Sequence, residues 1–358
     1  SFPDEEYILT GTLMDRGTGA PIVDEYGQQV TSQVTFTPST SNGTVEVVFV
    51  VDTRELFELV AFEDLDLSSG IDVCEHADLD DEGQTVRIGE IHTGAVDADT
   101  GTQIASSGMA TIIDYVHYEG LQPGCEYTMN GTMHLVGFGP DGERIDEGVI
   151  NAVDSDEVLC PSTVFVPTEH EGFVEVIFRV NTDRFRGCTV VCFESLQQGS
   201  VEFMSHADIN DEDQSVYIPS VSTNAYGADT MSDVVALGQR ARITDTVSYS
   251  NLIPGLQYTV SGSLYWMYTD ENGYIHSGAV ASLLGDGQGL ASKSFTPVSA
   301  DGSIDVEFIV DTTVLADLRY DRLVVIEDLI YNGTAIARHS DLNDEGQTVH
   351  LPSMHTTR

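Results

Sequence analysis

A short acidic segment occurs three times along the 358-residue chain, each time with a histidine at its start and a glutamine eight residues later. The copies read HADLDDEGQTV (76–86), HADINDEDQSV (206–216) and HSDLNDEGQTV (339–349). From Gln84 to Gln214 is 130 residues and from Gln214 to Gln347 is 133. This period is far longer than a solenoid repeat and suits independent domains, so the recurrence predicts globular units strung in line.

Alternating polar and apolar residues recur in each unit and predict half-buried strands. The segments are EYILTGTL (6–13), EYTMNGTM (126–133), QYTVSGSL (257–264), TVEVVFVV (44–51), FVEVIFRV (173–180) and SIDVEFIV (303–310). Clusters of Gly, Pro, Asn and Asp separate them, and no stretch shows a sustained helical period. This all-β pattern favours antiparallel sandwiches, while a barrel stays open as an alternative.

The net charge of −45 would repel phosphate backbones and anionic lipid headgroups, so we expect no nucleic acid and no membrane surface among the partners. No apolar run is long enough to span a bilayer, so we expect no membrane insertion. The chain shows no secretory leader or wall-sorting tail, and we expect it to be an excerpt of a longer protein. The five cysteines do not recur between units, which argues against a shared disulfide framework but leaves one pair in the second unit open.

Five polar residue types recur against a variable background. A near-continuous apolar strand carries one acid in each unit, in ELVAFEDL (58–65), TVVCFESL (189–196) and RLVVIEDL (322–329). The second unit contains Thr93, Asp114, Glu194, His206 and Gln214, and the third contains Thr223, Asp245, Glu327, His339 and Gln347. The first unit begins too late for the Thr and Asp and retains Glu63, His76 and Gln84, while Thr356 stands at the start of a further unit.

These residue types suggest acyl transfer between two side chains of one domain. A Thr hydroxyl needs a base, which His can supply, and a Gln amide is an acyl group that would release ammonia to leave a Thr–Gln ester. Fixed proximity contributes roughly 7–11 kcal/mol in effective-molarity estimates, and positioned proton transfer adds about 10²–10⁴ in rate. The pairs Asp114 with Glu194 and Asp245 with Glu327 are expected to share one proton each.

The motifs LVAFEDL, HADLDDEGQTV and HTGAVDADTG resemble the VaFE-repeat, or T-Q ester-bond, domains of surface adhesins from Gram-positive bacteria. The resemblance implies an all-β chain of tandem Ig-like (CNA-B-like) antiparallel β-sandwich domains in a linear stalk. It implies autocatalytic esters joining Thr93 to Gln214 and Thr223 to Gln347, with the Asp, Glu and His of each set in support. It also implies an extracellular, cell-wall-anchored location, with any host glycan or protein ligand bound by a tip domain outside this chain.

The expected domains follow from the resemblance and the repeats. They are 1–89, a partial ester-bond domain lacking its Thr strand; 90–219 and 220–352, two complete domains; and 353–358, the start of the next domain's Thr strand. Because the ester would form once within the protein, we expect no turnover enzyme and no cofactor. Departures from the family pattern, such as HSD for HAD at residue 339, leave the reactive residues unchanged.

Plainer interpretations stand beside this one. The recurring His could be an ordinary turn residue, and the buried Glu could be a structural acid that is hydrogen-bonded to backbone amides. The acidic segment could be a calcium-binding loop, but it lacks the ligand pattern of the helical calcium loop. A Lys–Asn isopeptide is excluded for at least two units, because Lys293 is the only lysine. Histidines that do not recur, including His92, His117 and His134, are expected to be surface or core residues.

Two alternative functions stay open. One is an extracellular ligand-binding module, with the aromatic segment LYWMYTDENGYIHSG (264–278) as the contact and a packed hairpin as its plainer interpretation. The other is head-to-tail self-assembly, in which Thr356 of one copy meets Gln84 of another by strand complementation. Otherwise the expected partners are neighbouring domains of the same chain.

Overall fold

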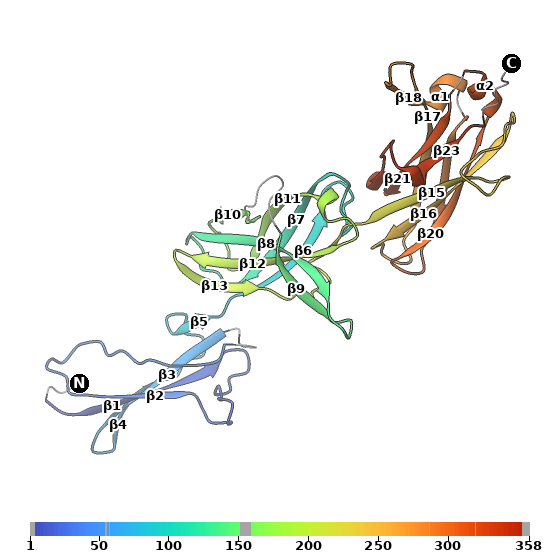
Figure 1. The fold of residues 1–358 in the computed structure, drawn as a ribbon. Coiled ribbons are helices and arrows are strands. Elements are labelled where there is room, and N and C mark those ends of the chain that lie inside the picture. Colours follow the sequence, from blue (N-terminus) through green and yellow to red (C-terminus); the bar gives the residue numbers. More distant parts are fainter. Residues whose placement is uncertain are drawn as a thin grey trace, which may run out of the picture.

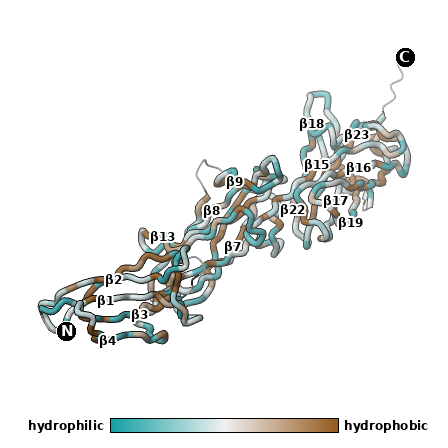
Figure 2. Tube along the Cα trace, turned by 90° about the horizontal axis from the view of Figure 1, so that it is seen from below, coloured by the Kyte–Doolittle hydropathy of each residue, from teal (hydrophilic) through white to brown (hydrophobic). Residues whose placement is uncertain are grey.

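The computed structural model describes residues 4–53, 56, 58–150, 159–285, 287–318 and 320–352. Three lobes of β-strands follow one another in chain order, as Figure 1 shows from the N-terminus to the C-terminus. Figure 2 shows hydrophobic segments running along the strands inside each lobe, while many connecting turns are hydrophilic. No helix in the described part of the chain is long and apolar enough to cross a bilayer.

The second lobe contains two antiparallel sheets. Its elements are β6 (Glu90–Asp97), β7 (Met109–Glu119), β8 (Tyr127–Phe138), β9 (Arg144–Val149), β10 (Ser162–Phe165), β11 (Gly172–Asn181), η1 (Thr182–Arg184), β12 (Thr189–Gln198), β13 (Val201–His206) and β14 (Ser215–Tyr217). One sheet has the order β10-β8-β12-β13, with β9 and β14 attached, and the other has the order β11-β7-β6. Alternate residues of β11 and β8 point inward, so that Val176, Phe178 and Met129 share one buried core.

The third lobe repeats this arrangement. Its elements are β15 (Ser220–Gly227), β16 (Ala241–Ser250), β17 (Tyr258–Thr269), β18 (Ile275–Ala279), α1 (Val280–Leu284), β19 (Leu290–Phe295), β20 (Gly302–Val310), α2 (Thr312–Asp317), β21 (Arg322–Tyr331), β22 (Thr334–His339), η2 (Glu345–Gln347) and β23 (Thr348–His350). The sheets are β15-β16-β20 and β18-β17-β21-β22, with β19 and β23 attached. The prediction of tandem all-β sandwiches is confirmed.

The first lobe forms a single antiparallel sheet, from β1 (Tyr7–Asp15), β2 (Thr31–Phe36), β3 (Glu58–Leu67), β4 (Ile71–His76) and β5 (Thr85–Arg87). The prediction of a strand over 44–51 is wrong. Its counterparts β11 and β20 pair with β7 and β16, and the described residues of the first lobe include no counterpart of either partner strand. Without backbone partners the segment stays irregular, although Phe49 still packs against the small apolar core of this lobe.

The two junctions between lobes differ. Between the second and third lobes, Asn251 Nδ2 donates to the Cys188 carbonyl at 2.6 Å, and Ile104 packs into the third core. Between the first and second lobes, Gly120 occupies the position that Asn251 holds in the third lobe, with φ +76°. A Cβ there would lie 3.0 Å from Gly89 Cα. At this junction the two backbones therefore approach each other closely, and Gly120 offers no side chain to take the place of the Asn251 hydrogen bond. All five cysteines are free thiols in this structure.

Candidate functional site

The second lobe brings the five recurring residues together from both sheets. Thr93 lies on β6 and Asp114 on β7, where Ala95 is opposite Asp114. Glu194 lies on β12 opposite His206 at the end of β13, and Gln214 directly precedes β14. The β11-β7-β6 sheet therefore supplies the hydroxyl and one carboxyl. The sheet that contains β12, β13 and β14 supplies the other carboxyl and the imidazole, and the turn before β14 supplies the amide.

The strand that carries Thr93 lies against the turn that carries Gln214. The Ile91 carbonyl accepts from His206 Nδ1 at 3.3 Å, and Ala95 N donates to the Asp213 carbonyl at 3.0 Å. These contacts stand on either side of Thr93. Gln214 Nε2 in turn donates to Glu194 Oε2, so the amide is held beside the buried carboxyl.

The third lobe repeats the arrangement with one closer contact. Thr223 lies on β15, and its Oγ1 is 3.4 Å from Nδ1 of His339 at the end of β22. Gln347 Nε2 lies 3.5 Å from Glu327 Oε2 and 3.3 Å from the His339 carbonyl oxygen. Asp245 on β16 completes the set opposite Ala225. Here the imidazole is placed to accept the proton of the threonine hydroxyl.

The carboxyls and the amide of each set are buried and poor in hydrogen bonds, while the Thr and His residues are partly buried. The exposed fraction is at most 2% for Asp114, Glu194, Gln214, Asp245, Glu327 and Gln347. Within the described ranges, buried side-chain polar atoms without a hydrogen bond of ordinary geometry include Thr93 Oγ1, both Asp carboxylates and the Oε1 atoms of these Glu and Gln residues. Apart from Arg322 Nε, every such atom belongs to a recurring residue. Buried orphan atoms are rare in folded proteins, and their concentration here marks a reactive or otherwise specialised site.

The carboxyl pairs are held in their protonated form. Burial first, and then the neighbouring Asp114 carboxyl, raises the pKa of Glu194 well above its ordinary range. The Gln214 amide, which donates to this carboxyl, and the Thr93 hydroxyl lower the pKa of Glu194 and so act in the opposite direction. Burial likewise raises the pKa of Glu327, with Asp245 as the next cause. Two buried carboxyls facing each other cannot both ionise at neutral pH, so each pair retains a proton.

A sixth recurring residue was missed in the sequence. Asp211 Oδ2 lies 2.8 Å from His206 Nε2, and Asp344 Oδ2 lies 3.1 Å from His339 Nε2. The first lobe repeats the contact between His76 and Asp81 at 3.0 Å. The signal was present, because an Asp follows the His by five residues in all three copies. This carboxylate fixes the imidazole with Nδ1 toward the Thr strand.

The first lobe holds only part of the set. Gln84 Nε2 donates to Glu63 Oε2, and burial raises the pKa of Glu63. The His76 side chain is 55% exposed, against 24% for His206 and 17% for His339. Among the described residues this lobe has no counterpart of the Thr and Asp strands, and Thr356 lies outside the described residues.

Comparison with known proteins gives a consistent family match. The model of a family described as "T-Q ester bond containing domain" matches three times, over residues 2–88, 89–218 and 219–351. No curated protein matches the chain. Among solved structures, an adhesin from Mobiluncus mulieris containing disulfide, isopeptide and ester bond cross-links is 11% identical, covering 70% of this chain and 84% of its own, with a TM-score of 0.28. A structure titled BspA_C_WT is 10% identical, covering 73% and 99%, with a TM-score of 0.35.

Proposed function

Because this chain belongs to the T-Q ester bond domain family, we propose that it is part of the stalk of a cell-surface adhesin, locked by esters that it forms itself. In this proposal Thr93 is joined to Gln214, and Thr223 to Gln347. One observation carries it: each threonine strand lies against the turn bearing the glutamine, around a buried carboxyl pair that retains a proton.

The reaction is followed most easily in the third lobe. His339 Nδ1 accepts the proton of Thr223 Oγ1 while Asp344 holds the imidazole from its other side. The freed Oγ1 attacks the Gln347 carboxamide carbon, and negative charge develops on Oε1. The pair of Asp245 and Glu327 lies beside this amide and, being neutral in part through its shared proton, does not repel the developing charge; it keeps this proton for the leaving nitrogen.

Collapse of the intermediate completes the transfer. The carbon–nitrogen bond of the Gln347 amide breaks, and its nitrogen leaves as ammonia after taking a proton from Glu327, whose Oε2 is 3.5 Å away. The imidazolium of His339 then returns the threonine proton to the carboxyl pair. Hydroxyl and amide become ester and ammonia, so atoms and charge balance. Each site reacts once and is consumed, which is cross-linking rather than enzymatic turnover.

The positions of the two partners explain the mechanical role. In the second lobe Thr93 lies on the first strand, β6, and Gln214 directly precedes the last, β14. Tension applied at the lobe's two ends therefore passes through the ester and does not load the hydrogen bonds between strands. Such a lobe extends little under force, as a stalk on the cell surface requires. Location outside the cell and attachment to the wall belong to the same proposal.

The structure of the aromatic segment does not support the alternative function of a ligand-binding module. Residues 264–278 fall largely in the β17–β18 hairpin, where Trp266 stacks on Tyr320 at 4.5 Å and Tyr268 stacks on His276 at 4.8 Å. The rings cover one another, as the plainer interpretation of a packed hairpin expects.

Head-to-tail assembly through Thr356 stays a prediction. In the second lobe the Thr strand β6 pairs with β7 alone, so completing the first lobe requires two added strands.

Pulling single molecules of the full chain tests the proposal. Wild-type second and third lobes are expected to show no unfolding extension, whereas a Thr223→Val variant releases about 400 Å from the third lobe alone. The variant keeps the side chain's shape and loses only the hydroxyl. Equal unfolding extensions in wild type and variant would contradict the proposal.

A further inference from the structure

The outer face of the second lobe's β6-β7-β11 sheet carries a row of ionisable residues. His92 on β6 lies directly opposite His117 on β7, and their rings stack at 6.5 Å. Glu90 on β6 lies opposite Glu119 on β7. Glu171 immediately precedes β11 and extends the row of carboxylates to the third strand. Like charges opposite each other on neighbouring strands destabilise a sheet. His92 Nε2 lies 3.2 Å from Glu90 Oε1, which leaves the carboxylates of Glu119 and Glu171 to be explained.

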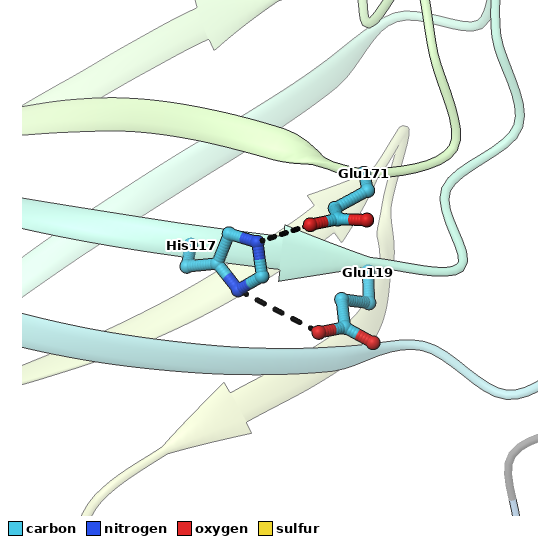
Figure 3. Close-up of side chains that lie close together, drawn as sticks. All are labelled: His117, Glu119 and Glu171. Atoms are coloured by element: carbon cyan, nitrogen blue, oxygen red, sulfur yellow. Dashed lines mark hydrogen bonds and ion pairs between the residues drawn. The ribbon is translucent and has the colours of Figure 1, made fainter.

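His117 lies between two of these carboxylates, as Figure 3 shows. Its Nε2 is 3.2 Å from Glu171 Oε1, and its Nδ1 is 3.7 Å from Glu119 Oε1. The three ligand atoms that these residues offer all lie within 4.8 Å of one another. The imidazole is 20% exposed and is backed by Phe173 at 4.7 Å, while the two glutamates are more open to solvent and free to turn.

The third lobe shows that the fold does not require these residues. Aligned on the shared Thr and Asp, it has Ser220, Ser222, Ser248 and Ser250 where the second lobe has Glu90, His92, His117 and Glu119. There Ser220 and Ser250 simply share a hydrogen bond of 2.6 Å across the strands. Small neutral side chains therefore satisfy the same strand positions, so Glu90, His92, His117 and Glu119 need a separate reason, whereas Glu171 has the acidic counterpart Asp301 in the third lobe.

The two glutamates of the cluster, but not His117, line a cavity of about 350 Å³ at the junction of the first two lobes. The first lobe contributes Glu58, Arg87 and Ile88, and the second contributes Glu90, Glu119, Gly120, His170 and Glu171. Arg87 is the only positively charged residue in this lining, and its guanidinium is already paired with Glu58 at 2.9 Å and Glu82 at 2.7 Å. The cavity is therefore rich in carboxylates and has room for a hydrated cation.

We propose that His117, Glu119 and Glu171 bind a divalent transition-metal ion of the zinc type at this junction. Zinc takes imidazole nitrogen and carboxylate oxygen at about 2.0–2.2 Å, so two of its ligand atoms lie roughly 3.4 Å apart in a tetrahedral site. The 3.2 Å separation between His117 Nε2 and Glu171 Oε1 fits that geometry. Glu119 Oε1 lies 3.7 Å from the other ring nitrogen, Nδ1, so the half-exposed Glu119 side chain turns to reach an ion held on Nε2. A mixed nitrogen and oxygen set with only three protein ligands suits zinc better than calcium, which takes 6–8 oxygens.

The competing explanation is that a protonated His117 bridges the two glutamates without any metal. Titration calorimetry of the full chain with zinc chloride separates the two, with calcium chloride as the second probe. His117→Ser installs the residue that the third lobe has at this position. Glu171→Gln removes one ligand charge outside the strands and keeps the side chain's size. His276→Ser is the matched control, because His276 also faces a carboxylate, Asp270, at 3.0 Å.

Wild type and His276→Ser are expected to bind one zinc ion with the same affinity, and calcium is not expected to compete. His117→Ser and Glu171→Gln should each weaken this binding at least tenfold, with ester formation unchanged by intact mass. The proposal is overturned if the wild type binds no zinc or if the two site variants bind it as tightly as wild type. It is equally overturned if His276→Ser loses as much affinity as they do.

Discussion

Replacing Thr93 by Val removes the nucleophile of the second lobe and keeps the β-branched shape of the side chain. Thr93 Oγ1 makes no hydrogen bond of ordinary geometry, although it lies beside the Glu194 carboxyl, so the substitution itself costs only about 1 kcal/mol. Any large loss of stability must then come from the missing ester. The third lobe, with its own Thr223, stays intact in the same molecule and serves as an internal reference.

The size of the loss follows from the loop that the cross-link closes. From Thr93 to Gln214 the ester spans about 120 residues, for which the chain-entropy model of a cross-link gives about 5 kcal/mol. For a lobe of about 130 residues with an unfolding entropy of about 2.1 cal/mol/K per residue, this corresponds to a fall in Tm of roughly 18 °C.

Differential scanning calorimetry of the full chain measures this shift. Thr93→Val should move one transition down by that amount and leave the transition of the third lobe in place. Thr93→Ser, which keeps a hydroxyl, should retain most of the stability once its ester has formed. A shift below about 5 °C for Thr93→Val, with a wild type that intact mass shows to be cross-linked, would refute the reasoning.

Three further predictions concern the chemistry of the site. Glu194→Gln removes the proton that the buried pair retains, so no ester should form in the second lobe. Intact mass should then show that this lobe has not lost ammonia. His339→Ala removes the base at Thr223 Oγ1 and should slow ester formation in the third lobe by about 10²–10⁴, measured by mass during refolding. In a Thr93→Val, Thr223→Val double variant, the free energy of unfolding should fall as pH rises from 5 to 9, as measured by chemical denaturation. The reason is that Glu194 loses its proton near pH 4.5 in the unfolded chain, whereas burial raises its pKa in the folded lobe. A free energy of unfolding that stays constant over this range would contradict the prediction.

Much of the fold follows from alternation along the chain, and its one failure has a physical cause. The segments 126–133 and 173–180 are strands β8 and β11, because each has the partners that its pattern requires. The segment 44–51 has the same alternation and is not a strand. Side-chain pattern gives only a tendency toward extended structure, while strand formation also needs a neighbouring backbone, which no single segment can reveal.

The five residue types of the candidate site could be predicted because they recur in the sequence. The supporting Asp of each site and the cluster around His117 could not, for two different reasons. Asp211 and Asp344 recur as faithfully as the His and Gln, but they stand among other acids in a turn and look like part of a solvated surface. Only the structure shows their contacts with His206 and His339. His117 was set aside because it does not recur. Glu119 follows His117 by two residues on β7, but Glu171 precedes β11, which is distant in sequence and pairs with β7 only in the fold. No local pattern therefore marks the whole cluster.

The intact mass of the folded, purified chain, measured under denaturing conditions, tests the central claim most directly. The account predicts a mass below that of the sequence by two molecules of ammonia, one for each complete lobe. Thr93→Val should restore one of them and Thr223→Val the other. A wild-type mass equal to that of the unmodified sequence, from protein that has folded, would contradict the account.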